Sequence, residues 1–390
     1  MLQSILKLLR HMSLLVVSIL LLLQKSWSFV TIIDRRCCNP RRRTRYRSVL
    51  GITTVSLESG ESAASGYRSS SSERDLRFAG VGRLYRSIES GARKNNEKSS
   101  KNATSEQPSS REGHLRVIDR LEKSRVVVVG LGGVGSWAAE ALCRSGIGHI
   151  TLIDLDDICI SNTNRQLHAL STSIGQMKID VMQTRLKDIN PDCEVTLIHD
   201  FVSKENADEI WNTIEEISTK PVTACLDAID GSDSKTAWIA SCARRKVPTV
   251  TCGGSAGRSD PTKFVSNDLT RAIEDPLLSS CRKNLRKYYG FAEGVSPGSK
   301  ARDQTTGKLR KKFPRKWRIE AVYSTESPRS VPKEAASMRR CDGALGTACF
   351  ATGTSGFIAA SRIVEMIAND KLSIPKQFHG NQLRSKTWGR

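Results

Sequence analysis

The chain has 390 residues, and 61 Lys and Arg stand against 40 Asp and Glu, which gives a formal net charge of +21. That length suits one large globular domain or two ordinary ones, and the composition, with 38% hydrophobic residues, excludes collagen, a coiled coil and a multi-span membrane protein. The 11 cysteines include no C-x-x-C pair, which argues against a structural zinc and a disulfide framework. The basic excess indicates a polyanionic partner, a targeting segment or both.

The N-terminal stretch has the composition of a targeting presequence. Lys7 and Arg10 precede an apolar run over 14–23, which is shorter than the ~20 residues of a spanning helix and is typical of a signal peptide. We therefore predict a signal peptide over 1–28 and no stable membrane span in the mature chain. Residues 29–72 are rich in Arg and Ser and poor in acids, as in a transit peptide.

The two parts together resemble the bipartite presequence of nuclear-encoded plastid proteins in algae with secondary plastids. This resemblance implies a plastid destination. The alternatives are a mitochondrion, the secretory pathway or an anchored N-terminus.

Strand and helix patterns alternate through the body of the chain. Short β-branched or apolar runs predict strands at 125–129, 149–154, 195–198, 222–226 and 247–251. Amphipathic or small-residue patterns predict helices at 137–144, 176–189, 204–217, 235–245 and 347–367. Repeated βαβ units with short links predict an α/β, Rossmann-like, doubly wound and mostly parallel sheet over 116–368, followed by a tail over 369–390. Such sheets bind ligands beyond the carboxyl ends of their strands.

A glycine-rich turn joins the first predicted strand to the first helix. Gly130, Gly132 and Gly135 satisfy G-x-G-x-x-G, which lets the backbone and a helix N-terminus approach a phosphate. Asp154 ends the next strand, where a carboxylate can bond ribose hydroxyls. These features predict a nucleotide site and fit a dinucleotide as well as ATP. The chain has no G-x-x-x-x-G-K-[ST] motif of a P-loop enzyme.

Charged residues downstream favour a triphosphate. Arg165 can clamp phosphate oxygens bidentately, and Lys178 can act as a point charge. Asp230, just beyond a predicted strand, can hold Mg²⁺ against the same oxygens. A dehydrogenase does not need both cations here, whereas attack on an α-phosphate with pyrophosphate leaving does.

These motifs resemble the E1-like adenylyltransferase superfamily, which includes ubiquitin-activating enzymes and the activators of molybdopterin- and thiamine-synthesis sulfur carriers. The resemblance implies an E1-like adenylation domain that binds ATP and Mg²⁺. The matching residues are Gly130, Gly132, Gly133, Gly135, Asp154, Asp156, Asn162, Arg165, Lys178 and Asp230.

Eight further stretches resemble the tRNA threonylcarbamoyladenosine dehydratase branch: 132–142, 162–170, 252–257, 260–262, 268–269, 275–277, 323–326 and 339–342. The resemblance implies adenylation of the threonyl carboxylate on the modified adenosine at position 37 of ANN-decoding tRNA. Ring closure by the neighbouring carbamoyl group, favoured by proximity, then expels AMP.

The resemblance also assigns two residues outside the ATP motifs. Arg83, in an N-terminal family segment over 73–115, would reach the ATP of a partner subunit and so imply a homodimer; the alternative is a solvated arginine. Cys341 would be a catalytic thiol that forms a thioester; the alternative is a structural thiol. An insertion over 93–114, rich in Lys, Ser and Asn, is predicted to be disordered.

A basic stretch over 279–318 is predicted to be an exposed loop. Its cations would neutralise tRNA phosphates, and its interleaved aromatic residues would stack on bases; the alternative is a solubilising loop. The aromatic residues are Tyr288, Tyr289, Phe313 and Trp317.

Two other functions compete with the dehydratase. The first is activation of a ubiquitin-like sulfur-carrier protein, although the zinc-binding Cys pairs common in those activators are missing. The second is an NAD-dependent oxidoreductase or a non-catalytic nucleotide-binding scaffold. The sequence leaves open whether a sulfur-acceptor protein partner or a monovalent cation takes part.

Overall fold

Four consecutive valines form most of an inner strand of the sheet. Strand β1 (Arg125–Val129) is buried along its whole length and pairs in parallel with β2 on one side and β4 on the other. The side chains of Val126 and Val128 face one hydrophobic cluster, and those of Val127 and Val129 face another. A run that is apolar on both faces is what a parallel strand covered by helices on each side requires.

The computed structural model describes residues 71–96, 110–292, 301–302, 309–310, 316–329 and 345–375. These residues belong to one unit, Ser65–Arg390. The predicted signal peptide, almost all of the transit-like segment, Phe313, Cys341 and the end of the tail lie outside the described residues. None of the described helices combines the length and apolarity needed to cross a bilayer.

Seven strands form the sheet in the order β3-β2-β1-β4-β5-β9-β6, all parallel except the last. This arrangement confirms the predicted α/β class. Besides β1, the strands are β2 (His149–Ile153), β3 (Glu194–Ile198), β4 (Ala224–Asp227), β5 (Thr249–Cys252), β6 (Phe264–Asp268) and β9 (Glu320–Ser324). A separate pair, β7 (Ala301–Arg302) and β8 (Leu309–Arg310), completes the described strands.

The sequence did not predict β6 and β9. The segment Phe264–Asp268 carries polar residues at three of its five positions, and its central residues are exposed or half-buried. It pairs on one side only, as the edge strand against β9. An edge strand is not buried on both faces, so it lacks the continuous apolar run by which the other strands were recognised.

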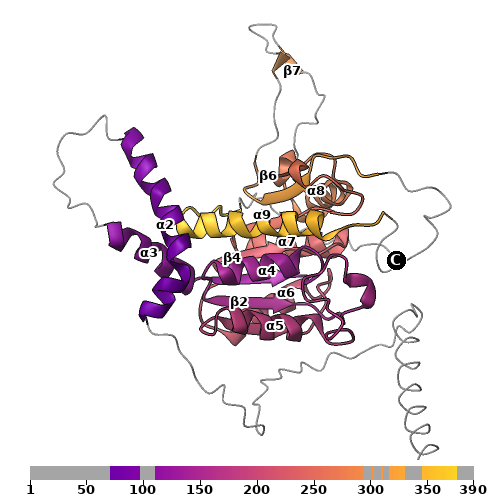
Figure 1. Ribbon diagram of the computed structural model, residues 1–390. Helices are drawn as coiled ribbons and strands as arrows, with labels where there is room; N and C mark the ends of the chain where they lie inside the picture. The colour runs from indigo at the N-terminus through magenta and orange to yellow at the C-terminus, as the bar shows by residue number, and fades with distance from the viewer. Residues whose placement is uncertain are drawn as a thin grey trace, which may run out of the picture. The chain divides into compact units, whose positions relative to one another are not determined.

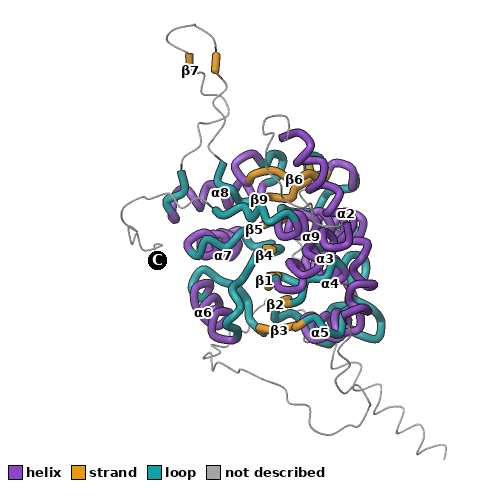
Figure 2. Tube along the Cα trace, turned by 90° about the vertical axis from the view of Figure 1, so that its left-hand side faces the viewer, coloured by secondary structure: helices purple, strands orange, loops and turns teal. Residues whose placement is uncertain are grey.

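Helices cover both faces of the sheet, as Figures 1 and 2 show. On one face lie α3 (Ser110–Lys123), α4 (Gly135–Arg144), α5 (Lys178–Ile189) and α9 (Cys349–Ala368). On the other lie α6 (Ala207–Ile217), α7 (Ser232–Arg244) and α8 (Pro276–Tyr289). Three short 3₁₀ turns, η2 (Ile160–Asn162), η3 (Pro261–Lys263) and η4 (Leu269–Arg271), lie in the connections.

The N-terminal family segment is helical and packs on the body. Helix α2 (Ser71–Asn96) contacts α3 closely at Gly82, where an added Cβ would lie 2.8 Å from the carbonyl oxygen of His114. Phe78 is buried against Gly146. The predicted disordered insertion over 93–114 is therefore wrong at both ends, since 93–96 and 110–114 are helical; residues 97–109 lie outside the described residues.

The prediction of an exposed basic loop is wrong for 279–289, which belong to α8. Leu278, Cys281 and Leu285 bury one face of this helix, and the carboxylate of Asp275 caps its start by accepting from the Leu278 N–H at 2.9 Å. The sequence analysis did not recognise this helix, because its few apolar residues are separated by many cations.

Trp317 cannot stack on a base, because it is only 1% exposed. Its ring lies 4.9 Å from that of Phe291, and the Arg286 guanidinium lies 5.3 Å from its centre. Tyr288 and Tyr289 are half-buried on α8. The described aromatic residues of this region therefore serve the core more than a ligand surface.

A candidate nucleotide site at the carboxyl edge of the sheet

The glycine turn after β1 leaves no room for side chains at two positions. Gly130 has a φ of +83°, which favours glycine, and an added Cβ would lie 2.9 Å from the carbonyl oxygen of Ala228. A Cβ on Gly135 would lie 1.8 Å from the carbonyl oxygen of Gly130. Helix α4 begins here, and no side chain of the described residues caps it. Its N-terminus is therefore suited to the oxygens of a phosphate.

Asp154 lies beside this turn at the end of β2. One carboxylate oxygen accepts the N–H of Leu131 at 2.5 Å, and the other accepts the N–H of Asp156 at 2.8 Å. Burial raises the pKa of Asp154, while the charge of Lys178 opposes the rise. The carboxylate is thus fixed against the glycine turn, where the sequence analysis placed a ribose ligand.

Lys178 and Asp156 meet next to Asp154. The Lys178 ammonium is 2.6 Å from the Asp156 carboxylate, and the Lys178 N–H also donates to the Asp156 carbonyl at 3.0 Å. Lys178 is the first residue of α5 and is 5% exposed, whereas the Asp156 side chain is half exposed. A ligand phosphate can therefore compete for the ammonium from the open side.

Arg165 lies in the loop after η2. Its guanidinium donates to the Ser161 carbonyl at 2.7 Å and to Asn164 Oδ1 at 3.0 Å. Its own carbonyl accepts from the Trp137 indole N–H at 3.0 Å and from the Thr352 hydroxyl at 3.2 Å. Helices α4 and α9 therefore both fix the backbone at Arg165.

The segment after Arg165 packs along the turn itself. The Leu167 N–H donates to the Ser136 hydroxyl at 3.2 Å, and His168 Nε2 donates to the Leu131 carbonyl at 2.8 Å. Burial lowers the pKa of His168 to about 4, so the ring is neutral at pH 7. His168 is a packing residue. The Asp156–Lys178 pair, through Asp154, and the segment that carries Arg165, through His168, are thus both tied to the same turn.

The remaining predicted residues fall in two places. Asn162 is buried, and its Oδ1 accepts the Cys159 N–H at 3.0 Å, so it shapes the turn before Arg165. Asp230 is exposed in the loop after β4, at the same edge of the sheet. No cluster of three or more metal-ligating side chains occurs among the described residues. Mg²⁺ commonly takes one or two carboxylates and completes its shell with phosphate oxygens and water, and Asp230 fits that pattern.

Arg83 is exposed on α2. Nearby, Arg77 donates to the Ile189 carbonyl at the end of α5, and Phe78 packs at the end of α4. These contacts anchor α2 at the opposite ends of α4 and α5 from the glycine turn. Within one protomer, α2 is therefore docked away from the candidate site.

The ThiF family model matches residues 107–389. The chain belongs to the ThiF family. The tRNA threonylcarbamoyladenosine dehydratase of Haemophilus influenzae is 39% identical over 259 residues, which cover 65% of this chain and 89% of that protein. The Escherichia coli enzyme of that name is 38% identical over 261 residues, covering 64% of this chain and 88% of that protein. The crystal structure of an E. coli tRNA N6-threonylcarbamoyladenosine dehydratase in complex with ATP matches with a TM-score of 0.55 and 33% identity, over 76% of this chain and 95% of that chain.

One element of this ThiF-family site was missed by the sequence analysis. Asp227 and Lys235 are both 0% exposed, and their charged atoms are 3.0 Å apart. The Lys235 ammonium also donates to the Ile229 carbonyl at 2.8 Å, and Asp227 accepts the Ile229 N–H at 3.0 Å and the Thr251 hydroxyl at 2.7 Å. Burial alone would lower the pKa of Lys235, but the charge of Asp227 raises it.

This buried pair fixes the loop that presents Asp230. Asp227 ends β4, Lys235 lies on α7, and both bind the backbone of Ile229, next to Asp230 in the chain. The signal available in the sequence was the spacing D-x-x-D-x-x-x-x-K over 227–235. The lysine was read only as the start of a helix.

We expect Lys235→Met to lower the free energy of unfolding by about 3–5 kcal/mol, because it leaves Asp227 buried without its partner. Removing both charges in Asp227→Asn/Lys235→Met should recover part of the loss. Urea unfolding measures both effects. Lys187→Met, at an exposed lysine of α5, is the control, and a single variant as stable as this control would show that the pair does not support the loop.

Proposed function

We propose that this chain is an ATP-dependent tRNA threonylcarbamoyladenosine dehydratase. The observation that carries the proposal is that one glycine turn holds both Asp154, next to the Asp156–Lys178 pair, and the segment that carries Arg165. The similarity to dehydratases over nearly nine tenths of their length, one of them crystallised with ATP, supports the same activity.

The geometry suits activation of a carboxylate. The substrate's threonyl carboxylate attacks the α-phosphorus of ATP, and pyrophosphate leaves. The neighbouring carbamoyl group then closes the ring on the activated carbonyl and AMP leaves, so the tRNA loses one water overall. Arg165 and Lys178 would neutralise the charge that develops on the phosphate oxygens, a role suited to fixed cations in a partly buried site.

Mg²⁺ is part of the proposal through Asp230. A magnesium ion supplies charge neutralisation of the phosphates when it is bound. The carboxylate of Asp230 would hold the ion at the carboxyl edge of the sheet, and the Asp227–Lys235 pair would keep its loop in place.

The direct test is the mass of threonylcarbamoyl-bearing tRNA after incubation with protein, ATP and Mg²⁺. The wild type should remove one water. Arg165→Ala and Lys178→Ala should each slow the reaction by roughly 10²-fold or more, since each deletes a cation facing the reacting phosphate. Both should unfold like the wild type.

Lys187→Ala is the matched control for loss of a lysine charge. An unchanged tRNA mass with the wild type would contradict the proposed function. Wild-type rates in both Arg165→Ala and Lys178→Ala would contradict the site.

The proposal includes a homodimer, which one face of α9 supports. Phe350 and Phe357 are each 51% exposed and lie two helical turns apart, so they share a face. Phe357 also packs edge-to-face against Trp137 of α4, with ring centres 5.8 Å apart. Exposed aromatic residues on one helix face are typical of a surface that a second subunit covers. In such a dimer, Arg83 would act on the partner's ATP.

We expect Phe357→Glu to convert the dimer to a monomer, because the interface would then bury an unpaired charge. Light scattering coupled to size exclusion measures the molecular mass. Ile217→Glu, at an exposed residue of α6 on the other face of the sheet, should leave the dimer intact. A wild-type monomer would contradict this part of the proposal.

The proposed location is a plastid. This location is supported by the apolar core over 14–23 and the Arg- and Ser-rich segment that follows, which together have the composition of a two-step targeting signal. A fluorescent protein fused to residues 1–72 should co-locate with chlorophyll in an alga with secondary plastids. Its retention in the secretory lumen would contradict the address.

A further inference from the structure

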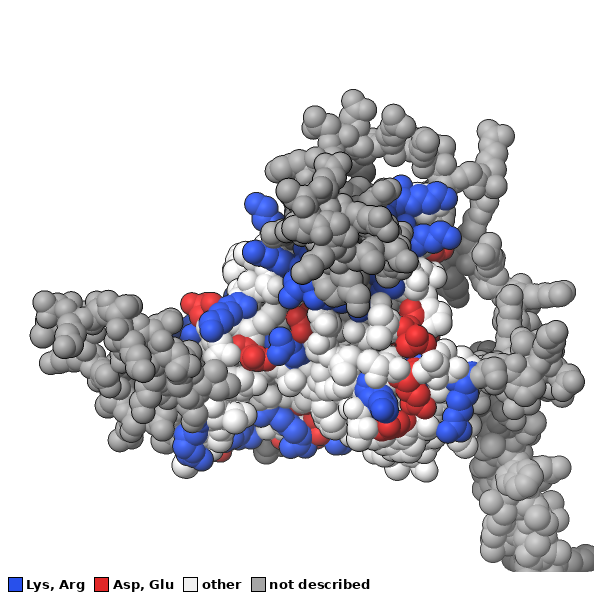
Figure 3. All heavy atoms as spheres, turned by 90° about the horizontal axis from the view of Figure 1, so that it is seen from above, with Lys and Arg blue, Asp and Glu red and all other residues white. Residues whose placement is uncertain are grey.

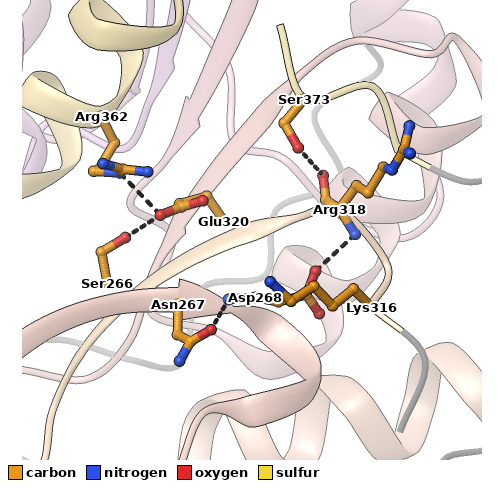
Figure 4. A pocket seen from close by; sticks show the side chains of 8 residues that line it. All are labelled: Ser266, Asn267, Asp268, Lys316, Arg318, Glu320, Arg362 and Ser373. Carbon is orange, nitrogen blue, oxygen red and sulfur yellow. Dashed lines mark hydrogen bonds and ion pairs between the residues drawn. The ribbon is translucent and has the colours of Figure 1, made fainter. Parts of the chain in front are cut away.

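A polar hollow of ≈ 390 Å³ lies at the opposite edge of the sheet from the glycine turn (Figure 4). Glu320 begins β9 and Asp268 ends the antiparallel β6, so the hollow is at the amino edge of the parallel strands. The lining residues are Ser266, Asn267, Asp268, Lys316, Arg318, Glu320, Arg362 and Ser373. None of them belongs to the nucleotide site.

Both carboxylates of the hollow are already occupied. Glu320 accepts from the Ser266 hydroxyl and from the Arg362 guanidinium at 2.9 Å. Asp268 accepts the backbone N–H groups of Trp317 at 3.1 Å and Arg318 at 2.7 Å. It also accepts both the N–H and the hydroxyl of Thr270. Glu320 is therefore paired with a guanidinium, whereas the charge of Asp268 is held by neutral donors.

Two cations remain for a ligand. Lys316 and Arg318 are exposed, and within the described residues neither side chain has an ion-pair partner. In Figure 4 the Lys316 side chain extends along the hollow toward Asp268, whereas the Arg318 guanidinium points outward. Asn267 Oδ1 accepts the Asp268 N–H at 2.8 Å, which leaves its amide nitrogen as a further donor.

The backbone that carries these cations is fixed. Arg318 has a φ of +59°, a backbone conformation that residues other than glycine rarely adopt. The two N–H bonds to the buried Asp268 carboxylate hold residues 317–318 in place, and the Ser373 hydroxyl donates to the Arg318 carbonyl. An ammonium, a guanidinium and an amide on a fixed backbone are the donors that bind phosphate oxygens.

The distance between the hollow and the nucleotide site indicates which kind of molecule carries the phosphate. The hollow is four residue steps back along β9, or about 13 Å, and three strand spacings from β1, or about 14 Å. The separation is therefore roughly 20 Å, which is about six base steps at 3.4 Å each. A mononucleotide cannot reach both places, whereas the arm of a tRNA can.

We propose that this hollow binds a backbone phosphate of the substrate tRNA while the reacting base lies at the glycine turn. The inference rests on the proposed function and names a docking point for its partner. In Figure 3, blue Lys and Arg side chains are interspersed with red Asp and Glu on the face seen from above, and α8 contributes the exposed Lys283 and Lys287 to the described surface. A positive surface outside the reaction site positions a nucleic acid without reading its sequence.

The test is the double variant Lys316→Gln/Arg318→Asn, in which asparagine tolerates the left-handed backbone of Arg318. We expect several-fold weaker binding of threonylcarbamoyl-bearing tRNA at low salt. The slope of log affinity against log salt should become shallower by about 1 to 2, one for each phosphate that the variant no longer neutralises. ATP affinity and turnover at saturating tRNA should match the wild type.

The matched control is Lys187→Gln/Lys220→Gln, which removes two exposed charges near the β3 edge of the sheet. A salt slope equal to that of this control would overturn the proposal. So would a double variant that loses binding of inorganic phosphate by calorimetry but keeps its tRNA affinity, because the hollow would then be a small-anion site.

The tRNA mass assay separates this inference from the proposed function. A shallower slope in the double variant, with no mass change in wild-type reactions, would reject the dehydratase and still support nucleic-acid binding at the hollow. A mass change with an unaltered slope would reject the hollow alone.

Discussion

No side chain can be placed where Gly135 passes Gly130, because even a single added carbon would lie 1.8 Å from a carbonyl oxygen. This close approach lets α4 start directly beneath the end of β1. Its N–H groups are thereby brought to the edge of the sheet, where a phosphate can meet them. Asp154 and His168 then hold the two sides of Leu131, the residue in the middle of the turn. Helices α4 and α9 fix the backbone of Arg165, and α5 begins at Lys178, so neighbouring helices also position the two cations.

The separation of chemistry from docking follows from the parallel sheet. Parallel strands place all their carboxyl ends at one edge, and the nucleotide site occupies that edge. The amino edge is left without a role in the reaction. In this chain the antiparallel β6 ends there, and its last residue, Asp268, organises two exposed cations. The same sheet thus separates a site for a small nucleotide from a surface suited to a long polyanion.

The sequence analysis succeeded where local chemistry determines the structure. The apolar run Arg125–Val129 predicted a strand buried on both faces, and the glycine spacing predicted a tight turn after it. It failed where the decisive contacts are distant in sequence. Strand β6 is defined by its partner β9, more than fifty residues later. From the sequence alone, Lys235 resembles a surface residue, but in the structure α7 packs it against the end of β4.

Trp317 shows that a residue expected at the surface can also turn out to be buried. In the sequence it stands among cations, like a residue that stacks on bases. In the structure, Phe291 and Arg286 enclose it, so it anchors the segment that leads into β9. The composition correctly indicated that this region is positively charged, but it could not show which aromatic ring is buried. The cations outside that core, Lys316 and Arg318, are the ones left for a ligand.

Helix α9 does more than pack against the sheet. Its Thr352 touches the Arg165 carbonyl and the space above Gly133, while Phe357, just over one turn later, faces outward. One helix therefore connects the outer surface to the backbone of Arg165. Any contact on that outer surface therefore acts, through the same helix, on the backbone that carries the arginine.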